Sequence, residues 1–329
     1  MNEKKTKNIL AINFGGIGDE VLLLPTLISL KKEFPNSKIT LALEPRSKGI
    51  TTLTNTIDEV ITVDIKRKNK YLELLKFIFK ARLKNFDLGI TAGGNKFVSI
   101  ILFLTGAKKR YGYNTGILSQ KLLTKTVELN KQQYAVKMYH DLVTPITNNT
   151  TELPQIKITP QEKIQNSILI HPGVSKMSVD KGMIKTVNAT TWADTIKLFI
   201  EKGKTVMLAG GPDDEECINE ILKQVNDDKL INYYGKTKSL KDLAELISSA
   251  EKFVCSDSAP MHIAVALGVK TYTIFGPTDD KKLAPPFVIT LKTNDNCPIK
   301  PCLWEKRQTS CDNPICLNFA SDDILREIL

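Results

Sequence analysis

A glycine-rich loop near the N-terminus places a carboxylate where a helix is expected to begin. The loop, Gly15-Gly16-Ile17-Gly18-Asp19, follows one apolar run and precedes another. Glycines let a ligand approach the backbone, and a helix N-terminus favours an anion. The loop is not a dinucleotide fingerprint, which would need a glycine at Val21, and it lacks the lysine of a P-loop. Asp19 is therefore either a general base or only a favourable partner of the helix dipole.

A second loop of this kind, CSDSAPMH, combines serine hydroxyls with the backbone amides of a helix start. Asp257 or Ser258 is the expected N-cap, and Pro260 suits the first turn. Free amides and hydroxyls in this position can hold a diphosphate. The alternative is a well-capped helix start, with His262 merely packing in the first turn.

Two further loops follow strands in the second half of the chain. GGPDDEE carries four acids in a first turn, where the helix dipole accounts for most of them. One acid there, Asp213 or Asp214, is instead a candidate to bind ribose hydroxyls. Gly276-Pro277-Thr278 is a turn by composition and is expected to border the same site.

These loops join strands and helices that alternate along the chain, which predicts the α/β class with mostly parallel sheets and helices on both faces. Leu72, Leu75, Ile78 and Phe79 recur at helical spacing. The expected strands are Asn8–Phe14, Ile39–Leu43, Val60–Val63, Asp87–Thr91, Lys109–Tyr113, Ser167–Ile170, Val206–Ala209, Ile231–Tyr234, Phe253–Ser256 and Thr271–Phe275. The expected helices include Glu20–Phe34, Tyr71–Lys84, Asn95–Thr105, Thr191–Lys202 and Pro260–Leu267, with others from Asp213 and Ser239.

A polar stretch with two prolines, Thr147–Asn166, predicts a linker between two doubly wound domains, residues 1–155 and 156–329. Ligands of such sheets bind at the carboxyl ends of the strands. The active site is therefore expected in the strand-to-helix loops of both halves, across a cleft.

Six cysteines in a chain without a recognisable secretory signal are expected to be thiols. Cys217 and Cys255 lie in apolar patterns and are expected in the core. Cys297, Cys302, Cys311 and Cys316 crowd into a short segment, but their C-x4-C-x8-C-x4-C spacing differs from the paired spacing of structural zinc. We expect no metal, and thiols that pack a compact loop; a metal site is the alternative.

The 329 residues carry a net charge of +10, and that charge is unevenly distributed. Residues 1–155 hold 24 Lys and Arg against 13 Asp and Glu, which leaves 22 against 23 for the remainder. This asymmetry indicates an acidic partner for the first half, although a solvated basic surface is the alternative. No apolar stretch approaches the roughly 20 residues of a membrane span. We expect a cytoplasmic protein that binds no nucleic acid, since no reading helix or aromatic basic strand pattern is present.

Taken together, the motifs have a recognisable order. ILAINFGGIGDEVLLLPTLISLKKEFP is followed by DLGITAGG, TGAKKRYGY, ILIHPG and VMLAGGPDDEE, and then by a long block from SLKDLAEL to FGPTD and a Cys-rich tail. This set resembles glycosyltransferase family 9, the ADP-heptose:lipopolysaccharide heptosyltransferases, over nearly the whole chain. The GD loop with Pro25 downstream and the SDSAPMHIAVALG to FGPTD block are the most specific parts.

The resemblance implies a GT-B enzyme in which two Rossmann-like domains face each other, the first binding the acceptor and the second a nucleotide sugar. It implies inverting transfer with Asp19 as base and an acceptor loop around Gly16 and Gly18. For the donor it implies phosphate contact from Lys185, or from Lys176 or Lys181 in its place, and ribose contact from Asp214 in preference to Asp213. The remaining donor-site residues that it implies are Asp257, Ser258, Ala259, Met261, His262, Gly276 and Thr278.

The resemblance further implies an ADP-sugar donor, no cofactor, and an anionic lipid-linked glycan acceptor at the inner face of the cytoplasmic membrane, where the protein would be peripheral. The loop Thr91-Ala92-Gly93-Gly94 departs from the family's DLQG, so the identity of the acceptor sugar stays open. Two other functions are considered: a nucleotide-sugar epimerase of the same architecture, and an inactive nucleotide- or glycan-binding protein.

Overall fold

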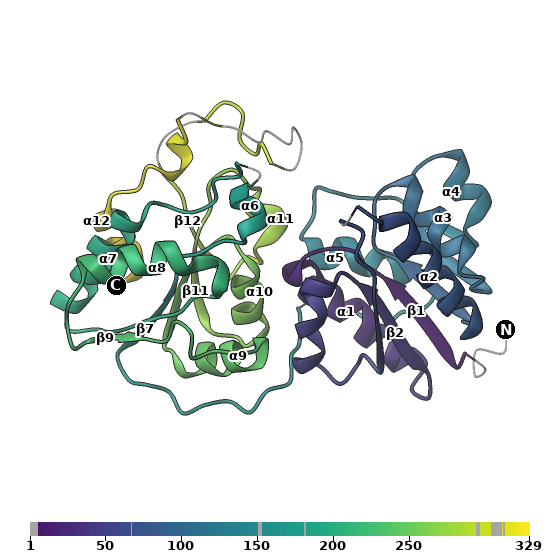
Figure 1. Ribbon diagram of the computed structural model, residues 1–329, viewed down its shortest axis with the longest axis horizontal. Coiled ribbons are helices and arrows are strands. Elements are labelled where there is room, and N and C mark those ends of the chain that lie inside the picture. The colour runs from purple at the N-terminus through teal and green to yellow at the C-terminus, as the bar shows by residue number, and fades with distance from the viewer. Residues whose placement is uncertain are drawn as a thin grey trace. The chain divides into compact units, whose positions relative to one another are not determined.

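The computed structural model describes residues 6–66, 68–150, 153–180, 182–293, 297–303, 311 and 313–329. The chain forms two compact units, Met1–Lys157 and Ile158–Leu329, each a sheet with helices on both faces (Figure 1). The boundary between the units lies inside the polar stretch 147–166. Among the described residues, no helix has the length and apolar character needed to cross a bilayer.

The described residues of the first unit form a sheet of six parallel strands in the order β3-β2-β1-β4-β5-β6, which is the doubly wound arrangement. The strands are β1 (Asn8–Ile12), β2 (Lys38–Leu43), β3 (Glu59–Thr62), β4 (Leu88–Thr91), β5 (Lys109–Tyr113) and β6 (Lys125–Val127). Strand β1 is paired in register with β2, where Ile9 lies opposite Ile39, and with β4, where Ile9 lies opposite Leu88.

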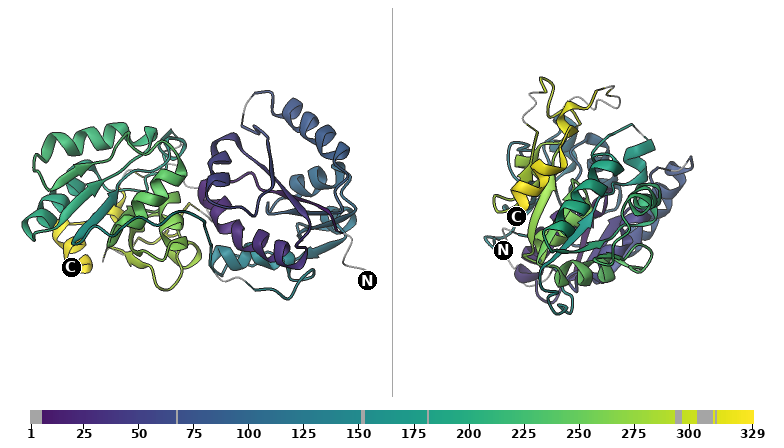
Figure 2. Two further views of the ribbon diagram at one scale, coloured as in Figure 1. Left: turned by 90° about the horizontal axis from the view of Figure 1, so that it is seen from below. Right: turned by 90° about the vertical axis from the view of Figure 1, so that its left-hand side faces the viewer.

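Helices cover both faces of this sheet. α1 (Ile17–Glu33) and α5 (Ala135–His140) pack together on one face, beside η2 (Pro45–Thr52) and η3 (Asp141–Val143). α2 (Lys70–Leu83), α3 (Lys96–Leu104) and α4 (Ile117–Leu122) lie on the other face (Figure 2). The core beneath α2 and α3 contains Leu74 and Phe77 of α2 packed against Leu10 and Ile12 of β1.

The second unit repeats the same topology with strand order β12-β11-β10-β7-β8-β9, all parallel. Its strands are β7 (Ser167–His171), β8 (Thr205–Leu208), β9 (Leu230–Asn232), β10 (Lys252–Ser256), β11 (Lys270–Ile274) and β12 (Ile289–Leu291). Its helices are α6 (Lys176–Asp180), α7 (Ala189–Glu201), η4 (Pro212–Asp214), α8 (Glu215–Gln224), α9 (Leu240–Ser249), α10 (Ala259–Ala266), α11 (Asp280–Leu283), η5 (Ile315–Leu317) and α12 (Ser321–Ile328).

The core of the second unit is built around α7, whose Trp192, Ile196 and Phe199 are fully buried. The C-terminal helix α12 packs against α7. Its last carbonyl, that of Ile328, accepts a hydrogen bond from Lys252 Nζ of β10 at 2.6 Å. The end of the chain is therefore integrated into the fold of this unit.

The structure differs from the sequence-based expectations in two ways that affect the site and the surface. α1 begins at Ile17 rather than Glu20. Ile17 and Gly18, which were expected in the loop, therefore lie inside the first turn of the helix. In α2, the predicted apolar repeat is mostly exposed: Leu72, Leu75 and Phe79 are 50%, 63% and 67% exposed. The buried stripe is instead Leu74, Phe77 and Ala81.

Candidate active site

Each sheet reverses its strand order at one place, between β1 and β4 in the first unit and between β7 and β10 in the second. In doubly wound sheets the ligand binds in the crevice outside the carboxyl ends of the strands at this switch point. The loop containing Asp19 follows β1, and the loop containing Asp257 follows β10. Both predicted loops therefore lie at a switch point of their own unit.

Two hydrogen bonds fix the orientation of the Asp19 carboxylate. Its Oδ2 accepts from the Gly16 N–H at 2.8 Å, and its Oδ1 accepts from the Tyr139 hydroxyl at 3.0 Å. A Cβ on Gly15 would lie 2.4 Å from Asp19 Cβ, so this fold of the loop requires glycine there. Burial and the negative charge of Asp19 raise the pKa of Tyr139 well above its usual value. The phenol therefore stays protonated and acts as the hydrogen-bond donor to Asp19. Gly18 lies half-buried in the same turn.

The residue that follows Asp19 in the chain is a buried acid. Glu20 is 1% exposed, and neither of its carboxylate oxygens has a hydrogen-bond partner among the described residues. Burial, and then the charge of Asp19, raise the pKa of Glu20 well above its usual value. Glu44, which follows β2, is also buried and pairs through Oε2 with Arg46 at 2.7 Å and with Lys66 at 2.9 Å. Asp19 is therefore the half-buried acid of this group, and Glu20 is the enclosed one.

In the second unit, three predicted residues from three loops meet at one oxygen. Asp257 Oδ2 lies 2.9 Å from Lys185 Nζ and accepts from the Thr278 hydroxyl at 2.6 Å. Asp257 and Thr278 are each 3% exposed. Burial alone would raise the pKa of Asp257, but the Lys185 ammonium, the Thr278 hydroxyl and nearby His262 outweigh it and hold that pKa below its usual range.

The segment that carries Lys185 is attached to the end of β10. Ser256 Oγ lies 2.9 Å from the Pro172 carbonyl and 2.7 Å from Thr186 Oγ1. Thr186 Oγ1 donates to the same carbonyl at 2.6 Å and accepts from Trp192 Nε1 at 3.1 Å. The buried Trp192 indole therefore positions the hydroxyl of Thr186. Because Thr186 follows Lys185 in the chain, this contact also restrains the backbone that carries the lysine.

Helix α10 begins beside this ion pair. Ser258 is its N-cap, but its hydroxyl makes no capping bond; its Oγ instead donates to the Ser256 carbonyl at 3.2 Å. Ser258 and Ala259 are half-buried, whereas Met261 and His262 are buried. Met261 therefore offers a ligand only its backbone, whose N–H already donates to the Ser258 carbonyl at 3.1 Å. The accessible part of this turn is Ser258 and Ala259, where the helix dipole favours an anion.

In the acidic loop after β8, both candidate acids have protein partners. Asp213 Oδ2 accepts from the Lys176 N–H at 2.8 Å. Asp214 is 6% exposed, and its Oδ2 accepts from the Gly211 N–H at 2.8 Å and lies 3.7 Å from His171 Nε2. Burial raises the pKa of Asp214 and lowers the pKa of His171, so both partners tend towards their neutral forms.

Gly276 has a packing role, since a Cβ there would lie 2.6 Å from Leu317 Cδ2. The sequence reasoning missed Tyr139, Thr186 and Gly173, and it assigned the Ser256 hydroxyl to a diphosphate site, whereas that hydroxyl contacts Pro172 and Thr186. For Gly173 the HPG motif at a strand end was a usable signal: a Cβ on it would lie 1.7 Å from Asp214 Oδ1. Lys181, the third candidate for phosphate contact, lies outside the described residues.

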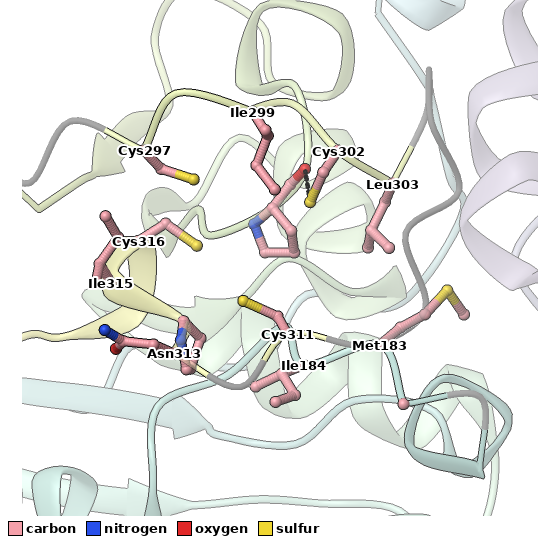
Figure 3. A pocket seen from close by; sticks show the side chains of 13 residues that line it. Met183, Ile184, Cys297, Ile299, Cys302, Leu303, Cys311, Asn313, Ile315 and Cys316 are labelled. Atoms are coloured by element: carbon pink, nitrogen blue, oxygen red, sulfur yellow. Dashed lines mark hydrogen bonds between the residues drawn. The ribbon is translucent and has the colours of Figure 1, made fainter.

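The four clustered cysteines line one pocket of the second unit. Figure 3 shows the sulfur atoms of Cys297, Cys302, Cys311 and Cys316 around a shared space that Ile299 and Met183 also border. Cys297, Cys311 and Cys316 are free thiols, and the Cys302 Sγ lies 3.8 Å from the Pro277 carbonyl oxygen. Burial raises the pKa of Cys316, and the other three cysteines add to this effect, while Lys300 opposes it. Within the described part of the chain, no group of three or more His, Cys, Asp and Glu is arranged to hold a metal ion.

Comparison with known proteins identifies the family. A model described as glycosyltransferase family 9 (heptosyltransferase) matches residues 74–311. The chain belongs to glycosyltransferase family 9. As a member of this family it is a glycosyltransferase.

Relatives and solved structures agree with this assignment. Lipooligosaccharide heptosyltransferase 2 of Campylobacter jejuni is 24% identical over 276 residues, covering 82% of this chain and 81% of the relative. The structure of E. coli ADP-heptose lipopolysaccharide heptosyltransferase II matches with a TM-score of 0.75 and 19% identity, covering 98% of this chain and 97% of that one. A family 9 structure from Veillonella parvula matches with a TM-score of 0.78 and 22% identity, covering 99% and 97%. The family 9 chain therefore has the GT-B fold.

Proposed function

We propose that this family 9 member is an inverting glycosyltransferase that moves heptose from ADP-heptose onto a lipopolysaccharide core or a related envelope glycan. The observation that carries the proposal is the meeting of Lys185, Asp257 and Thr278 beside the first turn of α10. An ammonium group and a helix N-terminus at one switch point suit a diphosphate. The names of the heptosyltransferase relatives support the choice of heptose and ADP.

The reaction we propose is a single displacement. The Asp19 carboxylate accepts the proton of an acceptor hydroxyl as that oxygen bonds to the anomeric carbon. The bond from the anomeric carbon to the diphosphate oxygen breaks, its electron pair leaves with ADP, and the configuration inverts. The Gly16 N–H and the Tyr139 hydroxyl hold the carboxylate in place for proton transfer.

On the donor side, Lys185 stabilises the charge that builds on the departing diphosphate. Its ammonium is held by Asp257 but retains further N–H donors for a phosphate oxygen. Ser258 and the first amides of α10 bind the same group. An acid of the loop after β8 contacts the ribose; Asp214 would have to leave the Gly211 N–H, and Asp213 the Lys176 N–H, to do so.

On the acceptor side, the excess positive charge of residues 1–155 favours an anionic substrate. We propose a lipid-linked glycan at the inner face of the cytoplasmic membrane, with the protein cytoplasmic and peripheral there. The mechanism as proposed uses no metal or other cofactor.

The donor assignment is tested with Lys185→Met and, as its matched control, Lys176→Met. Binding of ADP, UDP, GDP and CMP is measured by thermal shift, and turnover with ADP-heptose by ADP release. We expect ADP to stabilise the protein selectively, Lys185→Met to weaken ADP binding at least tenfold, and Lys176→Met to leave it nearly unchanged. Preference for UDP or GDP would reject an ADP-sugar as the donor, and no stabilisation by any of the four nucleotides would support an inactive glycan-binding protein.

The base assignment is tested with Asp19→Asn. We expect a loss of about 10²-fold or more in kcat, as for removal of a positioned general base, with ADP affinity within a few-fold of wild type. Near-normal turnover would remove Asp19 from the mechanism. Conversion of the nucleotide sugar without an acceptor would instead support the epimerase.

A further inference from the structure

One side of the first unit exposes an unusual amount of apolar surface. Helix α2 buries Leu74, Phe77 and Ala81 against the sheet, yet it also presents a second apolar stripe to solvent. The stripe consists of Tyr71, Leu72, Leu75, Phe79 and Leu83, which are 65%, 50%, 63%, 67% and 67% exposed. A helix that needed only to cover the sheet would carry polar residues at these positions.

The same kind of surface continues over the two neighbouring helices. α3 contacts both α2 and α4. Phe97 and Phe103 of α3 are 45% and 43% exposed, and Ile117 and Leu118 of α4 are 73% and 41% exposed. Of the thirteen large apolar side chains that are exposed in the described part of the chain, nine belong to these three helices. We call their exposed side the α2–α4 face.

Basic residues are interspersed with the apolar ones on these helices. The three helices contain Lys70, Lys76, Lys80, Arg82, Lys96 and Lys121, against a single acid, Glu73, which pairs with Lys76 at 3.0 Å. Two cations also lie over aromatic rings: Lys70 Nζ is 5.2 Å from the centroid of Tyr71, and Arg110 Cζ is 5.2 Å from that of Phe103. Such aromatic and cationic pairs suit an interface with an apolar side and an anionic side.

The face also adjoins the edge of the sheet that carries Asp19. α2, α3 and α4 follow β3, β4 and β5, so their N-termini lie at the carboxyl edge of the sheet, as does the loop after β1. A partner held on this face would therefore be near the strand ends at which Asp19 is positioned.

We propose that the α2–α4 face is a docking surface for an anionic lipid bilayer, with the α2 stripe entering the interface and the lysines contacting lipid headgroups. Large apolar groups supply burial in the headgroup region, and basic side chains supply attraction to anionic lipid. Charge argues against a second copy of this chain as the occupant, because two such faces would bring like charges together. The proposal extends the acceptor side of the proposed function, but its test does not depend on turnover.

The experiment measures binding of the full-length protein to vesicles by flotation. Vesicles of phosphatidylethanolamine with phosphatidylglycerol are compared with vesicles of phosphatidylcholine, at low and high salt. The double variant Leu75→Ser/Phe79→Ser tests the apolar stripe, and Phe287→Ser, at a 50% exposed side chain of the second unit, is its control. Lys76→Gln/Lys80→Gln tests the charge, with Lys223→Gln/Lys229→Gln of the second unit as its control. All these positions are exposed, so the variants are expected to fold.

We expect binding to the anionic vesicles, reduced by high salt and at least tenfold weaker in each α2 double variant, with both controls like wild type. Equal loss in the controls, or equal binding to both vesicle types, would overturn the proposal. Sedimentation velocity without lipid provides a further check: self-association that Leu75→Ser/Phe79→Ser abolishes would assign the face to a second copy. Turnover of the α2 variants with a soluble acceptor separates this proposal from the proposed function, since docking variants should retain it.

Discussion

At the scale of single residues, the Asp19 site depends on a partner that lies far away in the sequence. Tyr139 belongs to α5, and its hydroxyl reaches Asp19 across 120 positions of the chain. The sequence predicts Asp19 because a glycine loop between a strand and a helix is a local pattern. No local pattern marks Tyr139, because its role arises only when α5 packs against α1.

We predict that Tyr139→Phe lowers kcat about tenfold and leaves KM for the donor nearly unchanged. A hydrogen bond to a charged group contributes about 1.5–3 kcal/mol, and this one restrains the carboxylate that we propose as the general base. Tyr134→Phe is the matched control, because the buried Tyr134 hydroxyl has no partner among the described residues. Steady-state kinetics on both variants would contradict the positioning role if they lost activity equally.

Glu20 leads to a prediction about stability and pH. Its pKa is raised in the folded protein, so the folded state holds a proton that the unfolded state releases near its ordinary pKa of about 4.3. The contribution of Glu20 to the free energy of unfolding is therefore fully present below that pH. It is lost as pH rises towards the raised pKa, at up to about 1.4 kcal/mol per pH unit. We predict that Glu20→Gln, which cannot ionise, removes this loss.

The measurement is urea unfolding of wild type and Glu20→Gln at pH 5 and pH 8. The variant should gain stability relative to wild type as pH increases, and the difference between the two proteins isolates Glu20 from other titrating groups. A constant difference across this range would show that Glu20 ionises normally in the fold.

At the scale of elements, the long periodic helices and most strands were predictable, including β9 with its three residues, whereas several other short elements were not. The positions of the buried strands, and of helices such as α7, can be predicted from the spacing of apolar residues alone. β6, β12 and α4 have three to six residues each, too few to show a period, and the sequence analysis did not place them. Tertiary contacts rather than local propensity define such elements.

Helix α2 shows why a correct element can still have its faces assigned wrongly. The repeat of Leu72, Leu75 and Phe79 is typical of a core-facing stripe, and it predicts the helix correctly. The sheet nevertheless packs against Leu74 and Phe77. Because α2 is apolar on two sides, periodicity alone could not distinguish the stripe that faces the sheet from the one that faces solvent.

The glycine loop allows a prediction from two adjacent glycines. A Cβ on Gly15 would lie 2.4 Å from Asp19 Cβ, whereas a Cβ on Gly16 would lie 3.6 Å from its nearest neighbour, Arg46 Nη2. We expect Gly15→Ala to displace Asp19, lowering kcat/KM at least tenfold and stability by about 1–3 kcal/mol, as overpacking does. Gly16→Ala should cost less than about 1 kcal/mol, the scale of an N-cap change. Urea unfolding and kinetics check both, and equal effects would reject the steric explanation.

At the scale of the whole molecule, two units with one topology carry different chemistry. Both sheets have the same strand order, and each places its loops at the same switch point. The first unit holds an acid there and carries the excess of positive charge. The second holds an ion pair beside a helix N-terminus. This division of groups is what a transferase needs, because acceptor and leaving group make opposite electrostatic demands.

The division predicts where a nucleotide will act on the full-length protein. With ADP at 100 times its dissociation constant, amides that exchange through opening of the site should be protected by about 2.7 kcal/mol, or about 100-fold in rate. We expect this protection in residues 171–187, 256–262 and 276–278, and none in the loop that carries Asp19. Hydrogen exchange followed by mass spectrometry makes the measurement, with Lys185→Met as the control that should lose most of the protection. ADP is part of the proposed donor and is also a product, so the site where it binds marks the donor site. Protection confined to the Asp19 loop would therefore place the nucleotide in the first unit and reverse the assignment of donor and acceptor.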